Sequence, residues 1–183
     1  MRVFWEQGYE ATSIDELIDR TGLSRSSMYL AFGSKRGLFD SALERYLDLW
    51  IGSMLETLEG GRAGLDDVGA FFQGIAVALD DPAVDPELGC LMVNSIAELA
   101  WRDERMSAAG EGYRERLRKG FLRALRRAEN AGELSRGDLG SRARLLAALT
   151  LGVFLTQRGN PDLDNSRRLL GAIVDEVEAW RTD

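Results

Sequence analysis

The sequence contains no histidine and a single cysteine, Cys90, among its 183 residues. Without histidine the chain lacks the usual general base of enzymes and the commonest protein ligand of transition metals. A lone cysteine forms no intramolecular disulfide, and here it has no Cys–His partner for nucleophilic catalysis. No cation flanks Cys90, which favours a buried structural thiol over a reactive sensor. We therefore expect no enzyme, no metal and no cofactor.

Proline is also scarce, at three residues, while Leu, Ala, Arg and Glu are frequent. This composition favours helices throughout and predicts an all-α fold. The sequence has no phosphate-cradling glycine loop and no cationic, apolar signal segment at its start. The longest apolar run, 145–156, is too short to cross a bilayer. We expect a cytoplasmic protein with no membrane partner.

Capping signals and apolar spacing divide the chain into nine helices. Ser13 with Glu16 forms a capping box, and Ser24 is placed to cap the next helix. The predicted helices span residues 1–7, 13–21, 24–32, 35–58, 65–79, 89–101, 104–130, 139–158 and 165–181. The long helix from residue 35 bridges a small front module, 1–46, to a larger helical bundle, 47–183.

The two short helices near the start have the dimensions of a helix-turn-helix. By shape alone they fit a three-helix packing unit with no DNA role equally well. The order and spacing of five segments, however, resemble the DNA-binding domain of TetR/AcrR regulators. These segments are 8–14 (GYEATSI), 21–24 (TGLS), 28–29 (MY), 32–35 (FGSK) and 38–39 (LF). Members of that family usually carry a longer first helix, so either the start of this sequence is truncated or its first helix is short.

A helical wheel divides the second of these helices into two faces. Met28, Ala31 and Phe32 share one arc, which should face the core. In a major groove the opposite arc would place Arg25 at a guanine and Leu30 at a thymine methyl. Three further polar residues, Ser24, Ser26 and Ser27, belong to the predicted DNA-binding set. The alternative is an ordinary solvated polar face.

Phosphate contacts are the second part of the predicted interface. The resemblance implies this role for Tyr29 and Lys35. Thr12, Ser13 and the N-terminus of the helix after Ser13 are also placed to contact the backbone. The net charge of -7 is unusual for a nucleic-acid binder, but residues 20–36 contain four basic and no acidic residues. The local field is what acts on DNA.

The last two predicted helices carry more apolar surface than a monomer readily covers. The resemblance and this pattern together predict a two-fold homodimer built from both helices. Its predicted contacts are Leu145, Leu149, Gly152, Val153, Leu170, Ile173 and Val177. The alternative is that both helices only complete the monomer core.

The resemblance also implies a pocket for a small hydrophobic effector among the middle helices. Its expected apolar walls are Trp50, Met54, Phe71, Ile75, Met92, Phe121 and Phe154. Its expected polar groups are Asn94, Ser95 and Glu98. The function implied is a ligand-responsive repressor that binds double-stranded operator DNA. The alternative is a dimeric ligand-binding or interaction protein that has lost DNA binding.

Overall fold

The computed structural model describes residues 1–60, 64–81, 85–134, 137–159 and 161–182. In these ranges the chain is helical and forms no sheet, with one isolated antiparallel bridge between Leu134 and Arg181. The all-α prediction is therefore confirmed. The helices are α1 (Arg2–Gln7), α2 (Ile14–Thr21), α3 (Arg25–Phe32), α4 (Lys35–Tyr46), α5 (Gly52–Glu59), α6 (Leu65–Leu79), α7 (Leu91–Leu99), α8 (Glu104–Asn130), α9 (Leu139–Gly159) and α10 (Leu163–Glu178).

The predicted helix starts at the front of the chain are confirmed, but the capping box is only half formed, because the Glu16 carboxylate accepts from the Gln7 amide instead of the Ser13 N–H. The Ser13 hydroxyl accepts a hydrogen bond from the Glu16 N–H at 3.1 Å, and the Ser24 hydroxyl accepts one from the Ser27 N–H at 3.1 Å. Each bond satisfies a backbone donor that a helix leaves free in its first turn. Gly22 ends α2 with φ 69°, a left-handed conformation that favours glycine.

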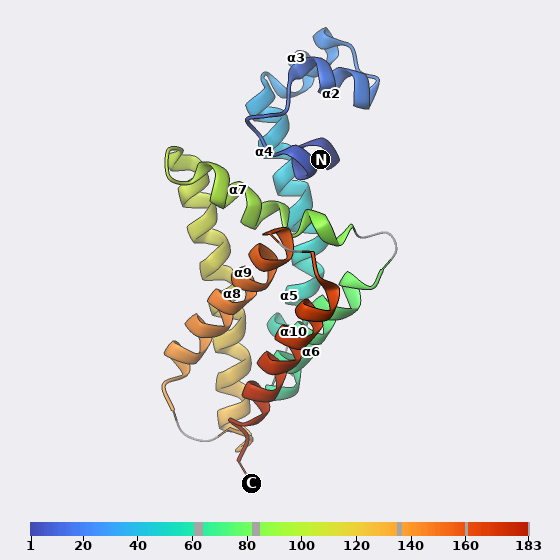
Figure 1. The fold of residues 1–183 in the computed structure, drawn as a ribbon. Coiled ribbons are helices and arrows are strands. Elements are labelled where there is room, and N and C mark those ends of the chain that lie inside the picture. The colour runs from blue at the N-terminus through green and yellow to red at the C-terminus, as the bar shows by residue number, and fades with distance from the viewer. Residues whose placement is uncertain (61–63, 82–84, 135–136, 160, 183) are drawn as a thin grey trace.

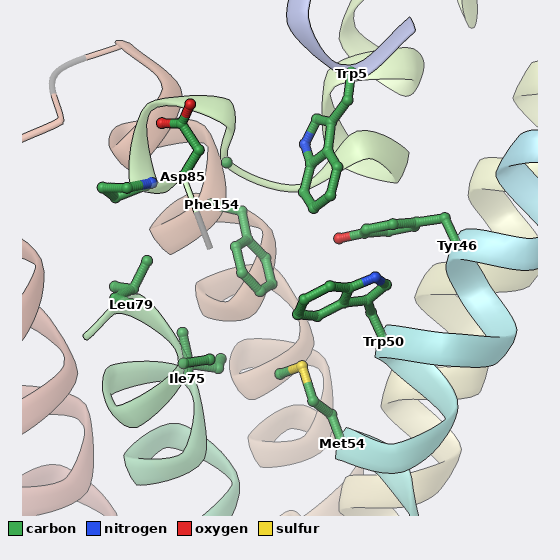
Figure 2. Close-up of a pocket in the computed structure, with 11 residues that line it drawn as sticks. Trp5, Tyr46, Trp50, Met54, Ile75, Leu79, Asp85 and Phe154 are labelled. Carbon is green, nitrogen blue, oxygen red and sulfur yellow. The ribbon is translucent and has the colours of Figure 1, made fainter. Parts of the chain in front are cut away.

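The bridging helix differs from the prediction. Instead of one uniform α-helix, α4 and α5 are joined by a π-helical turn, η1 (Leu47–Ile51). This interruption is why the described residues form ten α-helices where the sequence predicts nine. Side chains four apart drift by about 40° around an α-helix. A wider π turn reduces that drift, so Tyr46, Trp50 and Met54 line one side of the segment (Figure 2).

Two other boundaries were predicted wrongly. The expected helix 89–101 is shorter, because α7 spans Leu91–Leu99, and a short 3₁₀ turn, η2 (Pro86–Leu88), precedes it. Gly89 separates them with φ 59°, and a Cβ there would lie 3.0 Å from the Phe154 carbonyl oxygen. The last helix starts two residues early because the Asp162 carboxylate accepts from the Asn165 N–H at 3.0 Å.

A single apolar core runs through the molecule. It includes Val3 and Phe4 of α1, the stacked rings of Phe72 and Phe121, and Trp180 near the chain end. Figure 1 shows α2 and α3 at one end and the C-terminus at the other, with α4 leading from the first toward the second. Because α1 and α2 share this core through Phe4 and Leu17, a displacement inside the bundle has a packed route to them.

Candidate nucleic-acid interface and internal cavity

The outer face of α3 is the best-exposed part of the front module. Arg25, Ser26, Tyr29 and Leu30 are all exposed, Leu30 at 91%, whereas Met28 is buried at 1%. Exposed leucine at that level has no packing role in the monomer. The helical wheel therefore predicted correctly that these four side chains point outward and that Met28 points inward.

The inner face of α3 is narrower than the wheel predicted. Ala31 is exposed and Phe32 only half-buried, so their expected place in the core was wrong. The reason is length: α3 has eight residues and ends at Gly33, which is itself at the surface. Its last turn therefore runs past the elements against which Met28 packs.

Three hydroxyls gather at the N-terminus of α3. The Ser24 Oγ lies 3.0 Å from the Ser26 Oγ and 2.8 Å from the Ser27 Oγ, and all three residues are exposed. A helix N-terminus carries partial positive charge and free N–H groups, which favour an anionic oxygen. The group is thus chemically suited to a phosphate, while Ser24 also holds the helix start.

The basic stretch 20–36 is largely paired within the molecule. Arg20 lies 2.9 Å from the Glu6 carboxylate, and Arg25 forms an ion pair with Asp15 of α2. Arg36 bonds to Asp40 and to Asp103. The sequence shows no acidic residue inside the stretch, but the fold brings carboxylates to it from outside.

The Asp103 carboxylate has two structural roles. It accepts from the Met106 N–H at 3.0 Å, which caps α8, and it pairs with Arg36 of α4. The Arg36 guanidinium is the main reason that the pKa of Asp103 lies below its ordinary value. This pair ties α4 to the start of α8.

Two predicted phosphate-contact residues have internal partners. Thr12 is 1% exposed, and its hydroxyl donates to the Gly8 carbonyl oxygen at 2.6 Å. Its side chain is therefore closed to DNA, which corrects the prediction. The Lys35 ammonium lies 4.4 Å from the centre of the Tyr9 ring and 3.4 Å from the Glu10 carbonyl oxygen. Lys35 remains half-buried at the surface, close to the α3–α4 turn.

An apolar cavity lies where α1, the π turn, α6 and α9 meet (Figure 2). The space between its walls is about 490 Å³, a figure that includes the part open to solvent. Eleven residues line it: Trp5, Tyr46, Trp50, Met54, Ile75, Ala78, Leu79, Asp85, Pro86, Gly89 and Phe154. Asp85 is the one acidic or basic side chain among them.

Four of the ten predicted effector residues line this cavity: Trp50, Met54, Ile75 and Phe154. The other six do not. Phe71, Phe121 and Met92 are packed in the core with at most 3% exposure. Ser95 donates to the Leu91 carbonyl at 2.7 Å, and the Asn94 amide donates to that of Leu88 at 2.7 Å.

Glu98 has a structural role instead of a ligand-binding one. Its two carboxylate oxygens accept the Tyr9 and Glu10 backbone N–H groups at 2.9 and 2.8 Å. These donors belong to the turn that follows α1. The carboxylate therefore holds the front module against α7, and the predicted polar role in the cavity was wrong.

Trp5 and Tyr46 line the cavity but were not predicted. Their rings meet edge to face, and the Trp5 indole N–H donates to the Leu88 carbonyl oxygen at 3.1 Å. The regular spacing of Tyr46, Trp50 and Met54 was a sequence signal for one shared face. Nothing in the sequence indicated that Trp5 of the front module reaches the same space.

Cys90 lies beside the cavity wall and is fully buried. Desolvation raises the pKa of its thiol, while hydrogen bonding with Tyr46 lowers it by less. A high pKa and no access to solvent describe an unreactive thiol. This agrees with the structural interpretation of Cys90.

The outer face of α9 is apolar and uncovered in the monomer. Leu145 and Leu155 are 46% and 53% exposed, with Ala148 and Gly152 exposed between them. Four of the predicted dimer contacts, Val153, Leu170, Ile173 and Val177, are instead buried in the monomer core at 4% exposure or less. They were assigned wrongly because these amphipathic faces meet neighbouring helices of the same chain.

By length and composition α9 could also span a membrane, and 28% of its most apolar window is buried in the monomer. The helix is longer than the apolar run read from the sequence. A single helix of this kind does not identify a membrane protein. The small side chains on its outer face suit close contact with another helix.

Comparison with known proteins identifies the family of this chain. Residues 1–42 match a family model described as bacterial regulatory proteins of the tetR family. The HTH-type transcriptional regulator YezE of Bacillus subtilis is 31% identical over 166 residues, covering 90% of this chain and 84% of YezE. The chain belongs to the TetR family. It is a DNA-binding regulator of transcription.

Other TetR-family comparisons extend over different parts of the chain. The HTH-type transcriptional repressor ComR of Escherichia coli is 33% identical over 104 residues, covering 55% of this chain and 47% of ComR. The regulator CifR was solved with 26-bp double-strand operator DNA. It superposes with a TM-score of 0.80 at 26% identity, covering 97% of this chain and 90% of CifR. The likeness to a TetR-family domain drawn from residues 8–39 is therefore confirmed.

Proposed function

We propose that this TetR-family protein is a homodimeric repressor of the cytoplasm. Residues 1–46 bind operator DNA through α3, and residues 47–183 form the dimer and most of the site for a small, largely apolar effector. Effector binding in the Trp5–Tyr46–Trp50 cavity releases the protein from its operator. The operator complex of CifR and the repressor role printed for ComR support this proposal.

The observation that carries the proposal is the position of Trp5. This residue belongs to α1, in the proposed DNA-binding unit, yet it lines a cavity whose other walls are α4–α5, α6 and α9. A ligand in that cavity touches the DNA-binding unit directly. A ligand that binds two arrangements of α1 with different affinity necessarily shifts the balance between them.

Polar contacts give α1 a defined resting position. The Arg158 guanidinium of α9 donates to the Glu6 carbonyl at 2.9 Å and to the Glu87 carbonyl at 3.2 Å. The Trp5 N–H, which donates to the Leu88 carbonyl oxygen, also anchors this helix. A ligand that displaces Trp5 strains these bonds, and α1 carries that displacement to α2 and α3.

The exposed stripe of α9 supports the homodimer. Leu145, Ala148, Leu149, Gly152 and Leu155 recur at helical spacing on one side of the helix. A two-fold contact through this stripe would place two α3 helices on the same duplex, as half-site recognition requires. It would also cover apolar surface that the monomer leaves in water.

The proposal is tested with a labelled duplex from the region upstream of the protein's own gene. We expect binding that weakens steeply with salt and exceeds binding to a scrambled duplex by at least about a thousandfold. A small-molecule screen should then yield compounds that release the duplex and quench tryptophan fluorescence from the cavity. Equal affinity for both duplexes would contradict the operator-binding part, and release by compounds that do not enter the cavity would contradict the effector part.

A further inference from the structure

The cavity combines aromatic walls with a single acidic group. Trp5, Tyr46 and Trp50 form an edge-to-face cluster in which the Trp5 ring centre lies 5.0 Å from that of Tyr46 and 6.1 Å from that of Trp50. Both pairs have an interplanar angle of 73°. Rings at this angle present faces in different directions, and Figure 2 shows them arranged around the space in front of Phe154.

Aromatic faces attract positive charge. The face of an indole or phenol ring carries partial negative charge, and a cation over a desolvated ring is bound more tightly than a neutral group of the same shape. Two of the three rings are tryptophan, the strongest cation binder of the aromatic side chains. A neutral apolar ligand would be stabilised only by the apolar area that it buries against these rings.

Asp85 adds a formal negative charge to the same lining. Its carboxylate accepts from the Glu87 N–H at 3.1 Å and lies 3.7 Å from the Arg2 guanidinium. The Arg2 side chain is 64% exposed and does not line the cavity, so its attraction to Asp85 is screened by water. No lysine or arginine is among the described residues that line the cavity. An anionic ligand would therefore meet repulsion there without a compensating partner.

We propose that the effector is a lipophilic organic cation: a quaternary or protonated amine attached to a flat apolar body. The charged nitrogen lies against the Trp5, Tyr46 and Trp50 faces, in a cavity that Asp85 lines from the opposite side, and the apolar body lies along Ile75, Leu79 and Phe154. The net charge of -7 further favours the approach of cations. This inference rests on the proposed effector role of the cavity.

The test compares three probes that share a phenylalkyl body. These are (4-phenylbutyl)trimethylammonium, its neutral isostere with carbon in place of nitrogen, and 5-phenylpentanoate. Quenching of tryptophan fluorescence reports binding, and release of the labelled operator duplex reports function. We expect the cation to bind at least about tenfold more tightly than either other probe.

Two matched variants locate the preference. Asp85→Asn should weaken the cation about tenfold and leave the neutral isostere unchanged, because the carboxylate acts only on charge. Glu87 lies two residues further along the chain, is exposed and does not line the cavity. Glu87→Gln removes the same charge there and should change the affinity of neither the cation nor the neutral isostere. Trp50→Leu should reduce the preference for the cation over the isostere.

The outcomes separate this proposal from the proposed function. Equal or tighter binding of the neutral or anionic probe, no binding of the cation, or an unchanged cation affinity in Asp85→Asn would overturn the cation proposal. If that happens while a neutral or anionic probe releases the duplex, the effector role of the cavity stands. If the cation binds with the expected preference but does not release the duplex, the ligand class stands and the effector role fails.

Discussion

The indole of Trp5 packs edge to face on the phenol ring of Tyr46, with the two ring centres 5.0 Å apart. The first ring belongs to α1 and the second to the last turn of α4. This contact joins the start of the chain to the wall of the cavity. The stability of the front module should therefore depend on a side chain that also meets the ligand.

Trp5→Ala should lower the free energy of unfolding by about 2 to 3 kcal/mol, because it removes a half-buried ring and its aromatic contacts. Trp101→Ala is the matched control, since Trp101 is 78% exposed. We expect the control to change stability by less than about 0.5 kcal/mol. Urea unfolding followed by circular dichroism measures both. Equal losses would show that Trp5 does not brace α1.

Asp15→Asn should strengthen operator binding. In the free protein Asp15 holds Arg25, and this exposed pair must open before Arg25 reaches a base. Its loss should raise affinity by about twofold to fivefold. Asp19→Asn removes the same charge from an exposed position of α2 and gives the general electrostatic effect. Fluorescence anisotropy measures the operator affinity of both variants, and their difference gives the effect of releasing Arg25. Identical gains in affinity would contradict a competition between Asp15 and DNA for Arg25.

Arg25→Ala should cost about 1 to 3 kcal/mol of operator binding and relax preference at one base-pair position. The fold should be unaffected because the Arg25 side chain is 54% exposed. Binding to a panel of single-base operator variants measures the preference. An unchanged panel in a folded dimer would refute the assignment of Arg25 to base recognition.

Lys35→Ala should weaken all DNA sequences alike and reduce the salt slope of binding by about one. The ammonium is already near the surface, stacked on Tyr9. Lys119→Ala, on the exposed face of α8, is the control with the same change of charge. A salt titration distinguishes them, since only a phosphate contact alters the slope. If Lys35→Ala leaves the salt slope unchanged, Lys35 does not contact a phosphate.

Leu155→Glu should convert the dimer to a folded monomer, because it would bury an unpaired charge in the proposed α9 contact. Val77→Glu, at a position of α6 with 71% exposure, should leave the dimer intact. Light scattering gives the mass of each. Val153, which the sequence analysis placed in the dimer contact, is in the monomer core, so a charge there should unfold the chain instead.

Cys90 should resist thiol reagents in the native protein. Burial raises its pKa, so the thiolate fraction at pH 8 lies below that of a free cysteine, and the sulfur has no access to solvent. Reaction with a chromogenic disulfide should be slow in buffer and fast in urea. A fast native reaction would indicate that the thiol is exposed and reactive.

Features governed by neighbouring residues could be predicted from the sequence. Ser13 and Ser24 cap their helices through bonds to N–H groups three residues ahead, and Gly22 ends α2 as expected. The exposure of Arg25 and Leu30 follows from helical geometry alone. These contacts need no information about distant parts of the chain.

Features governed by tertiary packing could not be predicted. The pairing of Arg20 with Glu6, and the capture of the Glu98 carboxylate by the turn after α1, depend on helix placement. Trp5 enters the cavity for the same reason. Apolar periodicity marked Ile173 and Val177 as buried, but it does not distinguish a face that meets its own chain from one that meets a second copy.

The π turn at Leu47–Ile51 has an evolutionary consequence. Because a π turn holds about one residue more than an α turn, deleting one residue from it would restore α-helical winding and leave the residues that follow in nearly the same direction relative to Tyr46. A deletion in α5 before Met54 would instead rotate everything that follows it by about 100°. A single codon loss in the π turn would therefore change side chains of the cavity wall without turning the rest of the bundle against the helix-turn-helix before it.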